Sequence, residues 1–200
     1  MKNYIKCIMV CLFAAFSLMS CNDDNNDRDL TPEEINSIIN GFNGYYQGKL
    51  ISATDYNADT QKFLQQDTIM TEAAFGLDTT VTFSGFPVTY LAKKIKSDGN
   101  AELKEALEAA DIVNASGKFV PRLVNPLSVL INYVTFPLEY GGKQHSVTIS
   151  FLQYYSFAQF YSSKVVMQLL PAAVYVDGNL AEDILQSSQD VDLAYSFNQV

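Results

Sequence analysis

The chain has 200 residues, of which 13 are Lys or Arg and 22 are Asp or Glu, so its formal net charge is −9 at pH 7. This length fits one domain that can bury a sizeable hydrophobic core. The acidic balance argues against nucleic acid as a partner and against a basic face that docks on a membrane.

The first 20 residues have the pattern of a secretory signal peptide. Lys2 and Lys6 form a basic head, an apolar run covers residues 8–18, and Ser20 stands directly before Cys21. The run is too short for a membrane-spanning helix, which needs about 20 apolar residues. The junction resembles the lipobox of bacterial lipoproteins, which implies cleavage before Cys21 and acylation of that cysteine, with palmitate among the acyl chains. The alternative is an ordinary signal peptide with an incidental cysteine.

Cleavage there would leave 11 basic and 22 acidic residues, a net charge of −11. Cys7 and Cys11 would leave with the signal peptide, so the mature domain would hold neither a free thiol nor a disulfide. Residues 21–29 predict a lipidated cysteine followed by a flexible acidic tether, because the segment has no apolar surface to bury. Acidic residues at this position resemble the export signal of Bacteroidetes surface lipoproteins, although a plain spacer is equally compatible. We expect a lipid-anchored protein of the outer membrane, on its periplasmic or its cell-surface face.

The globular domain is expected over residues 30–200, and it begins with a short helix. Thr31 and Glu34 form a capping box around Pro32, which suits the first helical position. Gly41 and Gly44 are expected to end this helix.

Strands are expected after the helix. In the first, Gly48 indicates a bulge or a close approach of another backbone. The polar residues 55–67 predict a loop. The expected strands cover residues 44–51, 68–75 and 79–83.

Helical spacing begins at Pro87 and continues to Asp111, with a break at residues 97–100. Within this segment Leu103 and Leu107 belong to an apolar stripe. The acidic residues opposite that stripe predict a solvated face; they are Glu102, Glu105 and Glu108.

The remaining chain favours β-structure. Gly141 and Gly142 predict a tight hairpin turn between strands over residues 125–140 and 144–155. Alternation through the second arm would place Phe151 and Tyr155 in the core and leave Tyr154 exposed. Further strands are expected over 164–170, 172–176 and 191–197, with a turn at 177–179.

The sequence offers no catalytic residue, metal ligand set or cofactor motif. His145 is the only histidine, and no G-x-S-x-G motif presents a serine to it. Asp55, Asn57 and Asp59 match the start of a calcium-binding loop. The glycine and glutamate that such a loop needs are replaced here by Thr60 and Gln66.

The aromatic run over residues 151–161 supplies the candidate ligand-binding residues Tyr154, Tyr155 and Tyr161. Tyrosine rings can stack on a sugar or contact an apolar ligand. The alternative is that these rings belong to the core and to ordinary surface packing, since the chain has no Trp.

As a whole the chain resembles the small lipoproteins of Bacteroidetes that are known only as domains of unknown function. The Ser20–Cys21 junction, the acidic tether, the strand over residues 44–50 and the segment from Phe83 to Pro87 support this resemblance. The strand also resembles that of lipocalin-like lipoproteins, and no catalytic residue is implied.

We expect an α+β fold, in which an antiparallel, strongly curled or barrel-like sheet of seven to nine strands packs against the helical segment over residues 87–111. The expected function is non-enzymatic binding of a glycan or a small apolar ligand at the membrane. The alternative is a hydrolase that depends on carboxylates and tyrosines. The sequence leaves the ligand and the oligomeric state open.

Overall fold

The computed structural model describes residues 29–57, 62–96, 98–184 and 193–200. These residues form a mostly β structure of eleven strands and three short helices, and every strand pairing is antiparallel. In chain order the elements are α2 (Pro32–Phe42), β1 (Gly44–Asn57), β2 (Lys62–Phe75), β3 (Thr80–Pro87), α3 (Thr89–Ala92), α4 (Ala101–Ala110), β4 (Ile112–Val124), β5 (Leu127–Tyr140), β6 (Lys143–Phe151), β7 (Phe157–Tyr161), β8 (Lys164–Leu169), β9 (Pro171–Val176), β10 (Asn179–Asp183) and β11 (Leu193–Gln199).

Eight of these strands close into a barrel. The order runs β5-β4-β3-β2-β1-β11-β8-β7, and β7 pairs back with β5. The remaining strands, β6, β9 and β10, extend the other half of β5 into a lateral sheet. Closure removes the free edges of the barrel, whereas the lateral sheet ends at β10.

The strand β5 belongs to both sheets. Its first part, Ser128–Leu130, pairs with β7 in the barrel wall. Its second part, Tyr133–Tyr140, pairs with β6 in the lateral sheet. The two sheets therefore separate within the length of a single strand.

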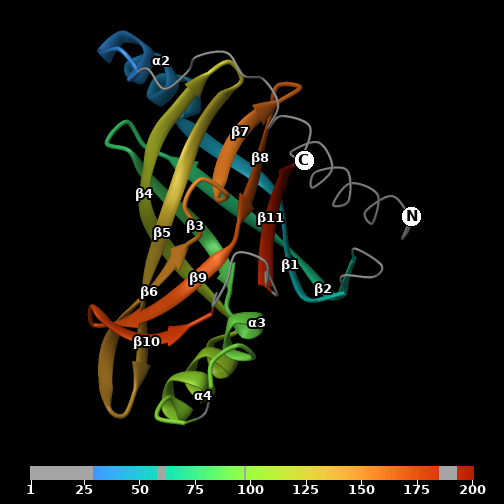
Figure 1. The fold of residues 1–200 in the computed structure, drawn as a ribbon, viewed down its shortest axis with the longest axis vertical. Coiled ribbons are helices and arrows are strands. Elements are labelled where there is room, and N and C mark those ends of the chain that lie inside the picture. The colour runs from blue at the N-terminus through green and yellow to red at the C-terminus, as the bar shows by residue number, and fades with distance from the viewer. Residues whose placement is uncertain (1–28, 58–61, 97, 185–192) are drawn as a thin grey trace.

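Helices cover the two ends of the barrel (Figure 1). At one end α2 inserts Phe42, whose ring lies 5.1 Å from that of Phe75 and 5.0 Å from that of Phe160. At the other end α3 and α4 bury Leu91 and Leu107 in the same hydrophobic core. The ends of the barrel are thus closed by apolar side chains.

A buried carboxylate joins the lateral sheet to the end of the barrel that α3 and α4 cover. Glu182 of β10, which is 7 % exposed, accepts the backbone N–H of Lys96 at 2.7 Å. Its other oxygen lies 3.3 Å from Nζ of the same lysine. Asn100 adds a side-chain N–H bond of 2.7 Å to the carbonyl of Ala181.

Several expectations from the sequence are confirmed. The capping box of Thr31 and Glu34 is present at the start of α2. Gly141 and Gly142 have φ values of +58° and +71° in the β5–β6 turn, as a primed hairpin turn requires. The barrel-like antiparallel sheet is also present.

The balanced α+β class is wrong, because the chain is mostly β and has more strands than the seven to nine expected. The helical segment expected over residues 87–111 is present as two short helices, α3 and α4. The loop expected over residues 55–67 instead belongs largely to the β1–β2 hairpin. Its outer part projects past the shorter β3, and residues 65–68 of β2 are exposed there. Gly41 lies inside α2, which ends at Phe42.

Gly48 confirms the expected close backbone approach in β1. A Cβ built there would lie 2.5 Å from the carbonyl oxygen of Asn198 and 2.5 Å from the ring of Phe197, both on β11. No side chain fits without separating β1 from β11.

We predict that Gly48→Ala lowers the free energy of unfolding by about 1–3 kcal/mol, the usual cost of overpacking a core. Urea denaturation of the domain measures it. Lys49→Ala, at the neighbouring exposed position, is the matched control and should change stability little. Equal stability of the two variants would contradict the β1–β11 contact.

Candidate functional site

The chain makes an excursion from the barrel wall between β6 and β7. Ser150 pairs with Tyr133 of β5, and Phe157 pairs with Leu130. Six residues, 151–156, therefore lie opposite two residues of β5, 131 and 132. Phe151 still pairs with Pro171 of β9, and the residues after it form a turn in which residues 153–155 are exposed.

This turn is hydrogen-bonded to the end of β8 and to the residue that joins β8 to β9. The backbone N–H of Leu152 donates to the carbonyl of Leu170 at 2.8 Å, and the N–H of Leu170 donates to Oγ of Ser156 at 3.0 Å. The side-chain N–H of Gln168 donates to the carbonyl of Tyr155 at 3.1 Å. We call residues Leu152–Ser156 the tyrosine turn, and its backbone is preorganised by these bonds.

Tyr154 holds an unusual backbone conformation. Its φ is +67°, and the N–H of Tyr155 donates to the carbonyl of Leu152 at 3.3 Å, which makes Tyr154 the third residue of a β-turn. Glycine or asparagine is usual where φ is positive, and a bulky side chain there costs of order 1–2 kcal/mol. Strain of this kind is concentrated at functional sites, which makes Tyr154 a candidate.

A bulge in β4 aims Arg122 at the tyrosine turn. The register between β4 and β5 shifts between Pro121 and Leu123, so Arg122 is the extra residue. Its Nη1 donates to the carbonyl of Tyr154 at 3.2 Å. Bulges often redirect a side chain next to a site. Arg122 was not among the residues predicted from the sequence. The scarcity of acidic residues around it could have indicated an unpaired basic side chain.

The structure brings together two of the three predicted tyrosines. Tyr154 and Tyr155 are adjacent in the turn and are 60 % and 58 % exposed. Tyr161 is 68 % exposed but lies at the far end of β7, paired with Lys164. At ~3.3 Å per strand residue, β7 alone separates it from the turn by about 13 Å.

Tyr155 does not lie in the core, contrary to expectation. Alternation from Phe151 fails because β6 ends at that residue and the tyrosine turn follows. Phe151 itself is buried, as expected.

The barrel interior is filled with large side chains. Phe83 packs against Phe86 with ring centroids 5.5 Å apart, and Phe86 packs against Tyr195 at 4.7 Å. Burial raises the pKa of Tyr195. Its hydroxyl has no hydrogen-bond partner among the described residues. Exposed aromatic rings are therefore found on the outer wall rather than among these residues.

His145 lies in a polar cluster at the end of the lateral sheet, away from the tyrosine turn. Its Nδ1 shares a hydrogen bond of 2.8 Å with Oδ2 of Asp177, and its ring stacks on Tyr140 at 4.1 Å. The backbone N–H of Ser146 donates to the same carboxylate at 2.9 Å. That bond, followed by the one to His145, lowers the pKa of Asp177. The cluster joins the β5–β6 and β9–β10 turns, which accounts for the histidine structurally.

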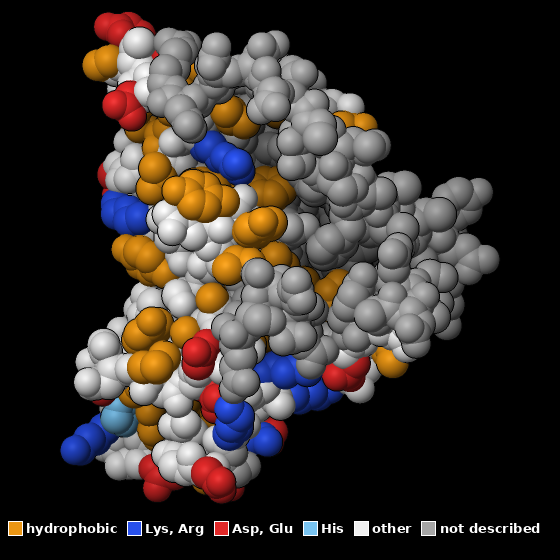
Figure 2. Space-filling model, in the orientation of Figure 1, with side chains coloured by type: hydrophobic (Ala, Val, Ile, Leu, Met, Phe, Trp, Pro, Cys, Tyr) orange, Lys and Arg blue, Asp and Glu red, His pale blue; other side chains and the backbone are white. Residues whose placement is uncertain are grey.

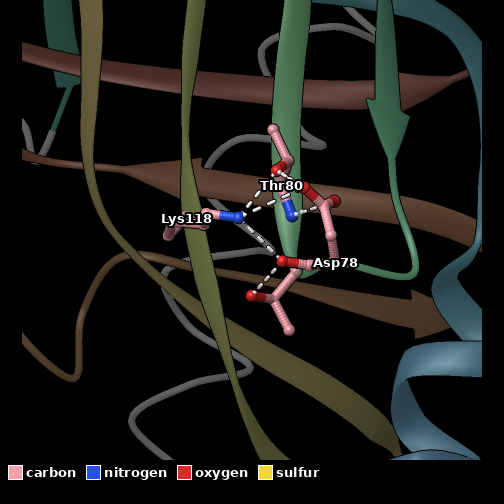
Figure 3. Close-up of polar contacts among 4 residues, drawn as sticks. Asp78, Thr80 and Lys118 are labelled. Carbon is pink, nitrogen blue, oxygen red and sulfur yellow. Dashed lines mark hydrogen bonds and ion pairs between the residues drawn. The ribbon is translucent and has the colours of Figure 1, made fainter.

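Another polar cluster stabilises the β2–β3 turn (Figure 3). Asp78 accepts the hydroxyl of Thr80 at 2.6 Å and its backbone N–H at 3.1 Å, and Nζ of Lys118 lies 3.3 Å from the same carboxylate. Together these contacts lower the pKa of Asp78 to about 2. A general acid needs a raised pKa, so neither Asp78 nor Asp177 suits the hydrolase alternative.

The described residues contain no group of three or more His, Cys, Asp and Glu side chains that could hold a metal ion. Asp55 and Asn57 lie on β1 rather than in a calcium-binding loop, and Asp59 falls outside the described residues. Glu105 and Glu108 are exposed on α4, in keeping with a solvated face. None of the helices in the described ranges has the length and apolar character needed to span a bilayer.

A family described as a domain of unknown function (DUF4840) matches residues 42–176. The chain belongs to this family. The match includes the tyrosine turn and Arg122, but it stops before β11, the strand that closes the barrel between β1 and β8. No curated protein and no solved structure matches the chain.

We predict that Asp78→Asn lowers stability at neutral pH, because the variant loses hydrogen bonds to a charged carboxylate. Since the folded-state pKa lies below the ordinary value of 3.8, this contribution is complete above pH 3.8 and is lost as the pH falls to about 2. Urea midpoints of wild type and variant, compared from pH 6 downwards, should converge near pH 2.

Asp98→Asn, which removes one negative charge from an exposed turn, is the control for the change in net charge. A difference between wild type and Asp78→Asn that stays constant over the same range would contradict the assigned contacts.

Proposed function

We propose that this chain is a lipid-anchored protein of the cell envelope that binds a glycan without transforming it chemically. The anchor is Cys21, and the contact surface is the tyrosine turn. Cys21 and the preceding signal lie outside the described residues, so the anchor rests on the sequence pattern alone.

One observation supports the binding site above the others. Two adjacent tyrosine rings are exposed on a turn whose backbone is hydrogen-bonded to β4 and to the Gln168–Leu170 segment. A preorganised aromatic surface loses little conformational entropy when a ligand binds, which favours affinity. Surfaces of this kind suit the apolar face of a sugar ring.

The filled interior favours a glycan over a small apolar ligand held inside the barrel. Both ends of the barrel are closed by helices, and buried aromatic rings occupy its core. An exposed tyrosine pair offers stacking area together with hydroxyl groups, which matches the mixed polarity of a saccharide.

For the anchor, we expect Cys21→Ala to move the protein from the membrane fraction to the soluble fraction, because the acyl chains that hold it at the bilayer can no longer be attached. Cell fractionation followed by immunoblotting measures this. Ser17→Ala, within the signal peptide, is the control. Unchanged membrane partition of Cys21→Ala would overturn the anchor.

For binding, we predict that Tyr154→Gly weakens glycan binding roughly tenfold, the loss expected from an aromatic hot spot. Glycine accepts the positive φ at this position, so the melting temperature should not fall. Affinity gel electrophoresis against a panel of neutral and acidic polysaccharides provides the measurement.

Tyr155→Ala should weaken the same interaction, and Tyr45→Ala, which removes a ring that is 79 % exposed on β1, should leave it unchanged. Binding that survives in both turn variants would disprove the site. Equal losses in the Tyr45 control would show nonspecific adhesion instead.

A further inference from the structure

Charge is distributed unevenly along this acidic chain. Residues 112–176 contain four Lys and Arg side chains and a single acid, Glu139, a net charge of +3 before counting histidine. Because the whole chain has a net charge of −9, the residues outside this segment together carry −12. The segment corresponds to β4–β9, the strands around the tyrosine turn.

The visible surface shows this separation in part. In Figure 2, acidic side chains lie mainly toward the two ends of the visible face, near α2 and α4, and the lower end also carries basic side chains. The middle of this face, over β4, β5, β7 and β8, displays hydrophobic and basic side chains. The tyrosine turn lies among these strands, so a ligand that reaches it avoids most of the negative charge.

Arg122 is the basic group that this face places at the turn. Lys118 is neutralised by Asp78, with Nζ 3.3 Å from its carboxylate. Lys143 is at the β5–β6 turn, and Lys164 follows the far end of β7. No described acidic side chain forms an ion pair with Arg122, whose bond to the carbonyl of Tyr154 uses one of five N–H groups.

We propose that the tyrosine turn recognises an anionic saccharide, with the rings of Tyr154 and Tyr155 against the sugar face and Arg122 paired with a carboxylate. This inference rests on the proposed function and names its ligand class. A planar guanidinium matches a carboxylate through two parallel hydrogen bonds, which distinguishes an acidic sugar from its neutral counterpart.

A saccharide fits better than an anionic membrane surface. A bilayer meets a broad area of the protein and would also face the acidic side chains of α2 and α4, whereas a saccharide chain needs only the strands around the turn. A polymer chain can follow the narrow acid-poor strip over β4, β5 and β7 and contact two tyrosine rings by stacking. The local charge of +3 over residues 112–176 therefore favours a linear anionic saccharide at the wall of the barrel, although the chain as a whole is acidic.

Polygalacturonate and its fully methyl-esterified form test this, since they share a backbone and differ in whether each carboxyl group is charged or capped by a methyl ester. Isothermal titration calorimetry of the folded domain should show about tenfold tighter binding of the acid form at low salt, the size of a hydrogen bond to a charged group. Added salt should reduce the difference, because it screens exposed charges.

Arg122→Gln is the informative variant, because its amide can still donate to the carbonyl of Tyr154 while the charge is lost. It should bind the ester as wild type does and lose most of the preference for the acid. Lys143→Gln removes the same charge at a remote turn and should keep the preference. Thermal melts of both variants establish that the fold is intact.

The possible failures are distinguishable. Equal binding of both polymers with a loss in Tyr154→Gly would keep the glycan site and overturn its anionic preference. If Arg122→Gln weakened binding of both polymers equally, Arg122 would only position the tyrosine turn, and the proposal would be overturned. Binding only to phosphatidylglycerol vesicles would show that this face contacts a membrane and would overturn the proposal. Binding to none of the probes would overturn the proposed function as well.

Discussion

The structure depends on β5 serving two sheets at once. Ser128–Leu130 closes the barrel through β7, and Tyr133–Tyr140 carries the lateral sheet through β6. Because β6 and β7 lie along the same edge of β5, the chain between them cannot continue as one straight strand once the sheets diverge. The branch point falls at residues 151–156.

The partner strands divide at the same level. β8 and β9 are separated only by Leu170, which bonds to both Leu152 and Ser156 of the tyrosine turn. The turn therefore fills the space where the barrel wall and the lateral sheet part. Its hydrogen bonds satisfy backbone groups that lose their ladder partners at the branch, and the same bonds support the positive φ of Tyr154.

Local sequence signals predicted the elements that are determined locally. The capping box of α2 and the two glycines of the β5–β6 turn are examples, because short-range chemistry fixes their conformation. Strand β4 was overlooked because its inward positions include the small residues Ala115 and Gly117, which weaken the apolar alternation. Gly117 is required by packing, since a Cβ there would lie 2.0 Å from the carbonyl oxygen of Tyr133.

The tyrosine turn could not be predicted in this way. Its residues lack the glycine, proline or asparagine that signal a turn, and the apolar alternation of β6 continues through them. Only the pairing of Ser150 and Phe157 with the same strand reveals the excursion. The candidates Tyr154 and Tyr155 were found from composition, whereas Arg122 required the bulge in β4.

The proposed site on the wall would separate binding from the stability of the core. The barrel ends are closed by Phe42 on one side and by Leu91 and Leu107 on the other, and these residues do not belong to the tyrosine turn. The turn exposes its rings and contributes mainly backbone hydrogen bonds to the fold. Under the proposed function, the side chains at Tyr154, Tyr155 and Arg122 could therefore change with the ligand while the barrel is preserved, provided that Ser156 and Gln168 keep the backbone in place.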